Sequence, residues 1–141
     1  MKEVHKVTDD NSLGEVIYTF EANALNKVNT NEEYLNRVRE GFHAVTTKSY
    51  GLGRNYIDTS HDPSGKTGTS QSFTDSDGDG RIDTPTVSTA FIGYAPTDSP
   101  KMSLTVTSPN SSLENSNINY SSMVTRRISK SVSDAYFAIY P

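Results

Sequence analysis

Residues 65–73, GKTGTSQSF, and residues 87–95, VSTAFIGYA, decide the fold of this chain. Both stretches have the strand-favouring composition of β-branched, aromatic and hydroxyl side chains, the second more strongly than the first. Between them lies the acidic, glycine-rich tract 75–83, whose composition is typical of a turn. The pattern therefore predicts a β-hairpin with a long polar tip.

Regular periodicity extends the fold on both sides of this hairpin. Apolar and polar residues alternate in 101–107, which indicates a strand with one buried side, and short connections favour an antiparallel meander of three strands. We expect a further strand at 14–20 and a polar loop at 108–122. The fold class that follows is α+β, an antiparallel β-sheet flanked by helices.

Two segments have apolar residues at helical spacing. The first helix is expected to begin at the capping box Thr30-Asn31-Glu32-Glu33 and to end near Thr47, and the second helix is expected at the C-terminus. The apolar stripes that we expect to pack inward are Leu35, Val38, Phe42 and Val45 in the first helix, and Val124, Ile128, Val132, Ala135 and Ile139 in the second.

Composition excludes several classes of function. The chain has 141 residues, a formal net charge of −4 and no cysteine. Its length fits one domain, its negative charge argues against a nucleic-acid partner, and disulfides and thiol chemistry are excluded. No apolar run approaches the roughly 20 residues of a membrane helix, so we expect any anchor or export signal to lie outside these residues.

The segment around Lys66 carries the most informative motif. Its Gly-Lys-Thr resembles the end of a phosphate-binding loop, but the leading glycine of that loop is replaced by Ser60 and a strand, not a helix, is expected to follow. As K-T-G-T on an edge strand, the residues suit recognition of an extended peptide. Gly68 leaves space for close approach, while Lys66 and the hydroxyls of Thr67 and Thr69 can hold a carboxylate. The plainer alternative is a hairpin strand with a surface lysine.

Several segments in order give this motif its context. Residues 20–28, 38–45, 64–71 and 90–96, with Ala135-Tyr136-Phe137 near the end, resemble the C-terminal part of class B penicillin-binding protein transpeptidase domains. The resemblance covers nearly the whole chain. It implies that residues 1–141 are the C-terminal portion of such a domain, without the lobe that carries the nucleophile.

The resemblance also implies a chemistry. In the family, a serine attacks a D-alanine carbonyl of a peptidoglycan stem peptide, and β-lactams acylate the same serine. By resemblance, Lys66 eases the development of negative charge, and the hydroxyls of Thr67 and Thr69 bind the terminal carboxylate. Gly68 leaves room for the substrate, and the backbone N–H of Thr69 is half of the oxyanion hole. No cofactor is required for this catalysis. The implied location is the extracytoplasmic face of the bacterial cell membrane.

The family's other two motifs are not matched. No Ser-x-x-Lys occurs in the chain, and Ser-x-Asn occurs only as Ser108-Pro109-Asn110, after the K-T-G strand, where we expect a strand-end turn and interpret the match as coincidence. We therefore expect the chain alone to be inactive. Its expected partners are the missing lobe of the same domain or a second copy of itself, and stem peptides and β-lactams in the intact protein.

The tract 75–83 resembles a calcium loop. Asp75, Asp77, Asp79 and Asp83 occupy loop positions 1, 3, 5 and 9, and the main-chain carbonyl of Arg81 occupies position 7. Position 12 is Thr86 instead of a bidentate glutamate, and strands flank the tract. An exposed Asp/Gly hairpin tip is the equal alternative to a structural calcium site.

The calcium loop also supports a rival function for the whole chain, a calcium-stiffened extracellular binding module without enzymatic activity. A transpeptidase portion should leave an apolar face uncovered, whereas a complete module should not. The histidines His5, His43 and His61 show no metal-ligand spacing and receive no role.

Overall fold

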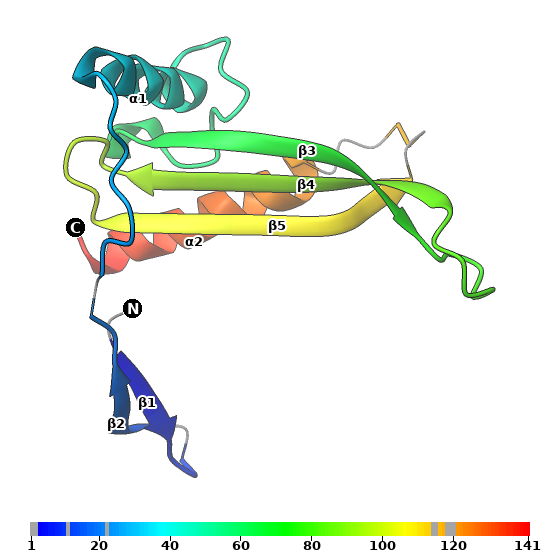
Figure 1. The fold of residues 1–141 in the computed structure, drawn as a ribbon, viewed down its shortest axis with the longest axis horizontal. Coiled ribbons are helices and arrows are strands. Elements are labelled where there is room, and N and C mark those ends of the chain that lie inside the picture. Colours follow the sequence, from blue (N-terminus) through cyan, green and yellow to red (C-terminus); the bar gives the residue numbers. More distant parts are fainter. Residues whose placement is uncertain (1–2, 11, 22, 114–115, 118–120) are drawn as a thin grey trace. The chain divides into compact units, whose positions relative to one another are not determined.

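The computed structural model describes residues 3–10, 12–21, 23–113, 116–117 and 121–141. The chain divides into two compact units, Met1–Asn31 and Glu32–Pro141. Antiparallel strands and two α-helices make up these units, so the predicted α+β class is confirmed (Figure 1). In the part of the chain that the structure describes, no helix is both long and apolar enough to cross a membrane.

The first unit is an antiparallel hairpin of β1 (Glu3–Val7) and β2 (Leu13–Thr19). β2 confirms the strand expected at 14–20. β1 was not predicted, because its five residues, EVHKV, mix charged and apolar side chains, although the Asp/Asn/Ser tract at 9–12 that follows them is a turn signal.

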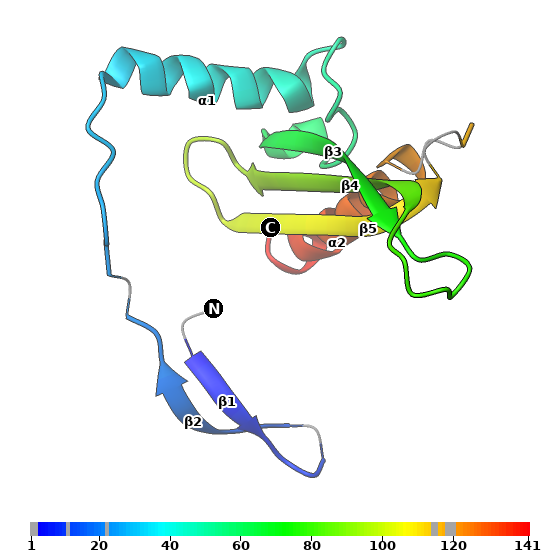
Figure 2. The same ribbon diagram turned by 45° about the vertical axis from the view of Figure 1, so that its right-hand side comes forward.

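The second unit is built on a three-stranded sheet in the order β3-β4-β5 (Figure 2). Its strands are β3 (Ser64–Thr74), β4 (Thr84–Ala95) and β5 (Met102–Leu113), and both pairings are antiparallel. The predicted hairpin, its polar tip and the three-stranded meander are confirmed. Lys66 pairs with Ile92 across β3 and β4, which fixes the register of the K-T-G segment.

The strand β5 is longer than expected. Residues 108–113 continue the strand, so Ser108-Pro109-Asn110 lies inside β5, and the predictions of a strand-end turn and of a loop there are wrong. The pairing continues past a register shift between Val87 and Thr89. Asn110, at φ 47°, helps to hold it: its side-chain oxygen accepts from the Thr86 hydroxyl at 2.8 Å. Because polar side chains hold this part of β5, its sequence lacks the alternation of apolar and polar residues from which a strand is predicted.

The first helix, α1 (Glu32–Thr47), ends where expected and lies beside β3. Its predicted apolar stripe is buried only in part: Leu35 and Val45 are half-buried, whereas Val38 is 53% exposed and Phe42 is 37% exposed. Thr46 is instead the one buried residue of this helix. Val38 and Phe42 thus keep apolar surface that the described residues do not fully cover.

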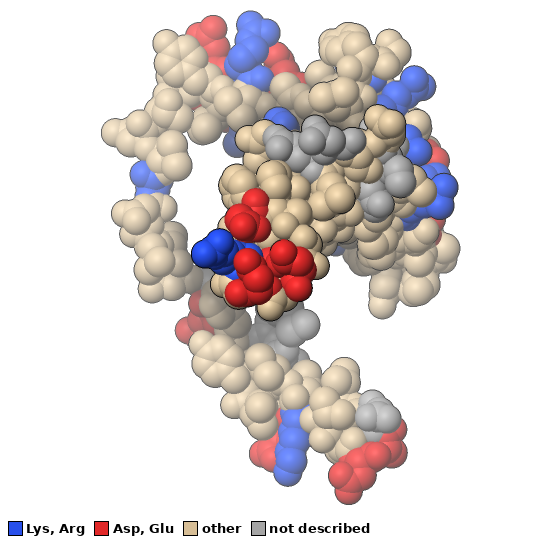
Figure 3. All heavy atoms as spheres, turned by 90° about the vertical axis from the view of Figure 1, so that its right-hand side faces the viewer, with Lys and Arg blue, Asp and Glu red and all other residues tan. Residues whose placement is uncertain are grey.

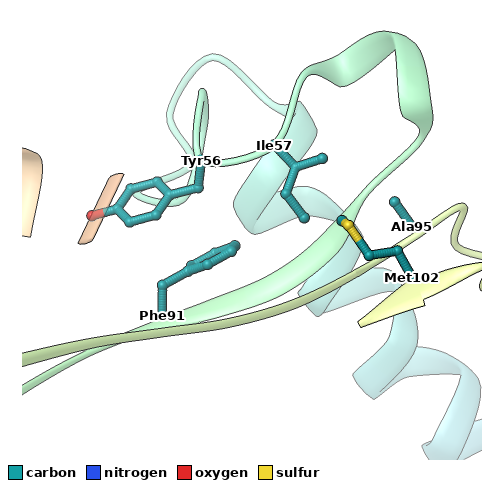
Figure 4. Close-up of a cluster of buried hydrophobic side chains, with 5 residues drawn as sticks. All are labelled: Tyr56, Ile57, Phe91, Ala95 and Met102. Carbon is teal, nitrogen blue, oxygen red and sulfur yellow. The ribbon is translucent and has the colours of Figure 1, made fainter. Parts of the chain in front are cut away.

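The core lies on one face of the sheet. It consists of Tyr56, Ile57, Phe91, Ala95 and Met102, with Leu104, Tyr136 and Phe137 packed against it. Figure 4 shows Tyr56 and Ile57 reaching from the loop before β3 toward Phe91 on β4, and the rings of Tyr56 and Phe91 lie 4.5 Å apart. Because side chains alternate along a strand, Ile92 lies on the opposite face, where it is 58% exposed.

The last helix, α2 (Arg126–Ile139), follows a π-helical turn, Ser121–Thr125, and packs against the core face of the sheet. Thr125, Ser129 and Ser133 are buried, whereas Ile128 and Val132 are 45% and 49% exposed, so the predicted inward stripe is wrong. The small hydroxyl residues let the helix approach closely, and Ser129 satisfies its hydroxyl by donating to the Thr125 carbonyl oxygen at 2.7 Å. The apolar stripe therefore faces away from the sheet.

Candidate functional site

The K-T-G segment occupies the free edge of the sheet. β3 pairs with β4 on one side, and no strand of the described ranges pairs with its other side. On such an edge, alternate residues direct their backbone N–H and C=O groups outward, where they can bind an extended peptide. Residues 66–69 thus have the edge position that recognition by strand addition needs.

The side chains of this segment point to both faces of the sheet. Lys66 and Gly68 share one face, opposite the core, while Thr67 and Thr69 lie on the other, because strand residues alternate. Lys66, Gly68 and Thr69 are exposed and Thr67 is half-buried. The Lys66 ammonium donates to the carbonyl oxygen of Thr67 at 2.6 Å. Among the described residues no carboxylate pairs with Lys66, so its charge is free to meet an anionic ligand.

A small apolar pocket of about 130 Å³ adjoins Lys66. Phe42 of α1, Gly65 and Lys66 of β3, and Ile92 and Tyr94 of β4 line it. An apolar floor with an ammonium at its margin can hold a small apolar group of a ligand next to a site of negative charge.

The acidic tip of the β3–β4 hairpin is a separate cluster. Ligand oxygens of Asp75, Asp77 and Asp79 lie within 4.8 Å of one another, and Figure 3 looks onto acidic side chains gathered at this tip. Asp75 accepts the N–H groups of Gly78 and Gly80 at 2.7 and 2.9 Å, and these hydrogen bonds lower the pKa of the Asp75 carboxyl.

Three carboxylates from one loop fit a hard cation such as calcium. The fit is incomplete, since Asp83 is outside this cluster and the N–H of Arg81 donates to Asp79 at 2.8 Å. The loop also satisfies itself through its own hydrogen bonds, as an Asp/Gly hairpin tip does.

One polar contact was missed by sequence reasoning. His43 Nε2 of α1 lies 2.8 Å from Asp62 Oδ1, just before β3, although the two residues are 19 positions apart. They line a pocket of about 430 Å³ between α1 and the β4–β5 connection. No spacing signal in the sequence could have paired them.

Comparisons with known proteins agree on one family. The model of the penicillin binding protein transpeptidase domain matches residues 1–131. Penicillin-binding protein 2A of Bacillus subtilis (strain 168) is 33% identical over 139 residues, covering 99% of this chain and 19% of the relative. Penicillin-binding protein H of the same organism is 33% identical over 106 residues, covering 75% of this chain and 14% of the relative.

A solved structure is similar as well. Penicillin-binding protein 2B from Streptococcus pneumoniae (strain R6) superposes with a TM-score of 0.55 at 26% sequence identity, covering 90% of this chain and 20% of that one. The chain thus spans no more than about a fifth of the length of the proteins that it matches.

Proposed function

The chain belongs to the family of penicillin-binding protein transpeptidase domains, and from this premise we propose that it supplies the K-T-G strand of a peptidoglycan D,D-transpeptidase. The observation that carries the proposal is the position of Lys66, exposed on the free edge of β3 beside a small apolar pocket. The stem peptide of peptidoglycan is the substrate. It acylates a serine in another part of the protein, and β-lactams are the inhibitors that acylate that serine.

Each K-T-G residue has a role in this proposal. The peptide lies along β3, with its terminal carboxylate near the hydroxyls of Thr67 and Thr69, and Gly68 leaves room for its backbone. Lys66 eases the charge that develops as the serine, borne by another part of the protein, attacks the carbonyl carbon. The Thr69 N–H donates one hydrogen bond to the resulting oxyanion, a type of contact whose loss costs about 3 kcal/mol.

Uncovered apolar surface supports the proposal over the rival binding module. Ile92 on the Lys66 face, Val38 and Phe42 on α1, and Ile128 and Val132 on α2 are all exposed. We propose that the lobe bearing the serine covers these residues, with self-association as the alternative when that lobe is absent. We place the intact protein at the extracytoplasmic face of the bacterial cell membrane, where its substrate is assembled.

The proposal is tested by acylation with labelled penicillin. The isolated chain should form no covalent adduct, since it has no Ser-x-x-Lys. A chimera of Penicillin-binding protein 2A in which this chain replaces the matching segment should form one, and Lys66→Ala should abolish it. Lys48→Ala, at an exposed lysine just after α1, is the matched control. An adduct on the isolated chain, or full acylation of the Lys66→Ala chimera, would contradict the proposal.

We further propose that the hairpin tip binds calcium through Asp75, Asp77 and Asp79, with the Arg81 carbonyl and Asp83 completing the site, and that the ion has a structural role. The clustering of the three carboxylates supports this proposal. Calorimetric titration with millimolar calcium should give a binding heat that Asp77→Asn diminishes. A titration without heat would leave a hairpin tip held by its own hydrogen bonds.

A further inference from the structure

Two side chains of α1 hold the segment that leads into β3. The imidazole Nε2 of His43 lies 2.8 Å from Asp62 Oδ1. One helical turn further on, the hydroxyl of Thr46 donates to the carbonyl oxygen of Pro63, and Thr46 has no exposed surface. The two residues that precede β3 are therefore fixed to two side chains one turn apart on the helix.

The same segment is also held from the β4–β5 connection. The backbone carbonyl oxygen of Asp62 accepts hydrogen bonds from both the N–H and the hydroxyl of Thr97, each at 2.8 Å. The Thr97 and Ser64 hydroxyl oxygens lie 2.9 Å apart, and Ser64 is fully buried. We name this network the strand anchor; it consists of His43, Thr46, Asp62, Ser64 and Thr97.

The strand anchor ends where the K-T-G segment begins. Ser64 and Lys66 lie on the same face of β3, two residues apart. Beyond Ser64 the backbone of β3 pairs only with β4, so no second strand of the described ranges pairs with its outer edge. The strand anchor therefore sets the direction of residues 66–69 and, with it, the position of their outward-facing backbone N–H and C=O groups.

Within the anchor, the pair of His43 and Asp62 is the part that can vary. Their side chains are 36% and 53% exposed, whereas Thr46 and Ser64 are buried. Arg39, Glu40 and Asp98 also line the pocket, but Arg39 pairs with Glu32 at 2.9 Å and Glu40 with Arg37 at 3.1 Å. Asp62 is thus the charged group in direct contact with His43.

We propose that His43 is a positioning residue for the K-T-G strand, acting through its hydrogen bond to Asp62. The benefit of this positioning to peptide binding rests on the proposed function, but its effect on the K-T-G strand can be measured in the isolated chain. Loss of the bond should let residues 64–69 open more often without unfolding β4 and β5.

The test compares His43→Ala with His43→Gln by site-resolved hydrogen exchange on the 141-residue chain. Alanine removes the donor, and glutamine keeps an N–H donor near the position of Nε2. His43→Ala should speed exchange of the paired amides in residues 64–69 about 3- to 10-fold, the range expected for one hydrogen bond. His43→Gln should restore exchange to within about twofold of the wild-type rate.

Controls separate local positioning from general stability. Arg37→Ala, on the exposed side of α1, should leave residues 64–69 unchanged. Asp62 is a poorer site for substitution, because its φ of 49° would strain an alanine there. The proposal is overturned if His43→Ala leaves residues 64–69 unchanged, if it speeds exchange equally in β5, or if His43→Gln behaves like alanine. None of these results depends on penicillin binding, so failure of this proposal and failure of the proposed function can be told apart.

Discussion

Gly65, immediately before Lys66, lies too close to the core to carry a side chain. A Cβ built there would be 2.7 Å from the carbonyl oxygen of Ile92 and 2.8 Å from the Phe91 ring carbon Cζ. The first contact is to the backbone of the paired strand, so the clash cannot be relieved by a side-chain rotation alone. Gly68 provides a matched comparison, since its Cβ would meet only Ala90, at 3.7 Å from that residue's Cβ.

We therefore predict that Gly65→Ala destabilises the chain and Gly68→Ala does not. Overpacking of this kind costs about 1–3 kcal/mol, and the backbone contact favours the upper half of the range. Gly68→Ala should stay within about 0.5 kcal/mol of the wild type, because ordinary van der Waals contact remains. Urea unfolding followed by far-UV circular dichroism measures both, since the chain has no tryptophan for fluorescence. Equal unfolding midpoints for the two variants would refute the packing argument.

Two further predictions concern other parts of the chain. Hydrogen bonds from Thr8 and Ser12 lower the pKa of Asp10 from 3.8 to about 2. Its contribution to the β1–β2 hairpin should therefore be complete well above pH 3.8, fall progressively as pH drops from there toward 2, and be absent at lower pH. Carbon NMR titration should show Thr8→Ala raising this pKa, and an unchanged value would contradict the assignment. On α2, Val132→Asp should change the free energy of unfolding of the isolated chain by no more than about 0.5 kcal/mol, because Val132 is half-exposed. Ser133→Leu should instead cost about 1–3 kcal/mol, because Ser133 is buried. Thermal melts of both variants check the orientation of the helix.

The hairpin that carries the K-T-G segment could be predicted because several local signals agree there. Strand-forming residues flank a tract of aspartate and glycine, and Gly78 and Gly80 do adopt the positive φ angles, 79° and 87°, that such turns require. Alternation in residues 101–107 then placed the third strand. These signals depend only on residues close together in the chain, so they can be recognised in a single sequence without knowledge of tertiary contacts.

The parts that could not be predicted depend on distant partners. The helical spacing in α2 identified an apolar stripe correctly, but the stripe through Thr125, Ser129 and Ser133 has the same periodicity and is the one that packs inward. Periodicity gives the faces of a helix and not which face meets the sheet. The pair of His43 and Asp62 likewise depends on how α1 lies beside β3, which no local pattern specifies.

The contacts of β3 change in character along its length, and this change suits the function that we propose. Up to Gly65 the strand is buried, tied through Ser64 and packed against Phe91 so tightly that a methyl group is excluded. From Lys66 to Ser70 the side chains are mostly exposed, and no strand of the described ranges pairs with the outer edge. A strand that receives an added peptide needs both properties, since a rigid base lowers the entropy lost on binding and a free edge supplies the hydrogen bonds. An unprotected edge of this kind also promotes aggregation, so the isolated chain should self-associate through β3 more readily than when a bound peptide pairs with that edge.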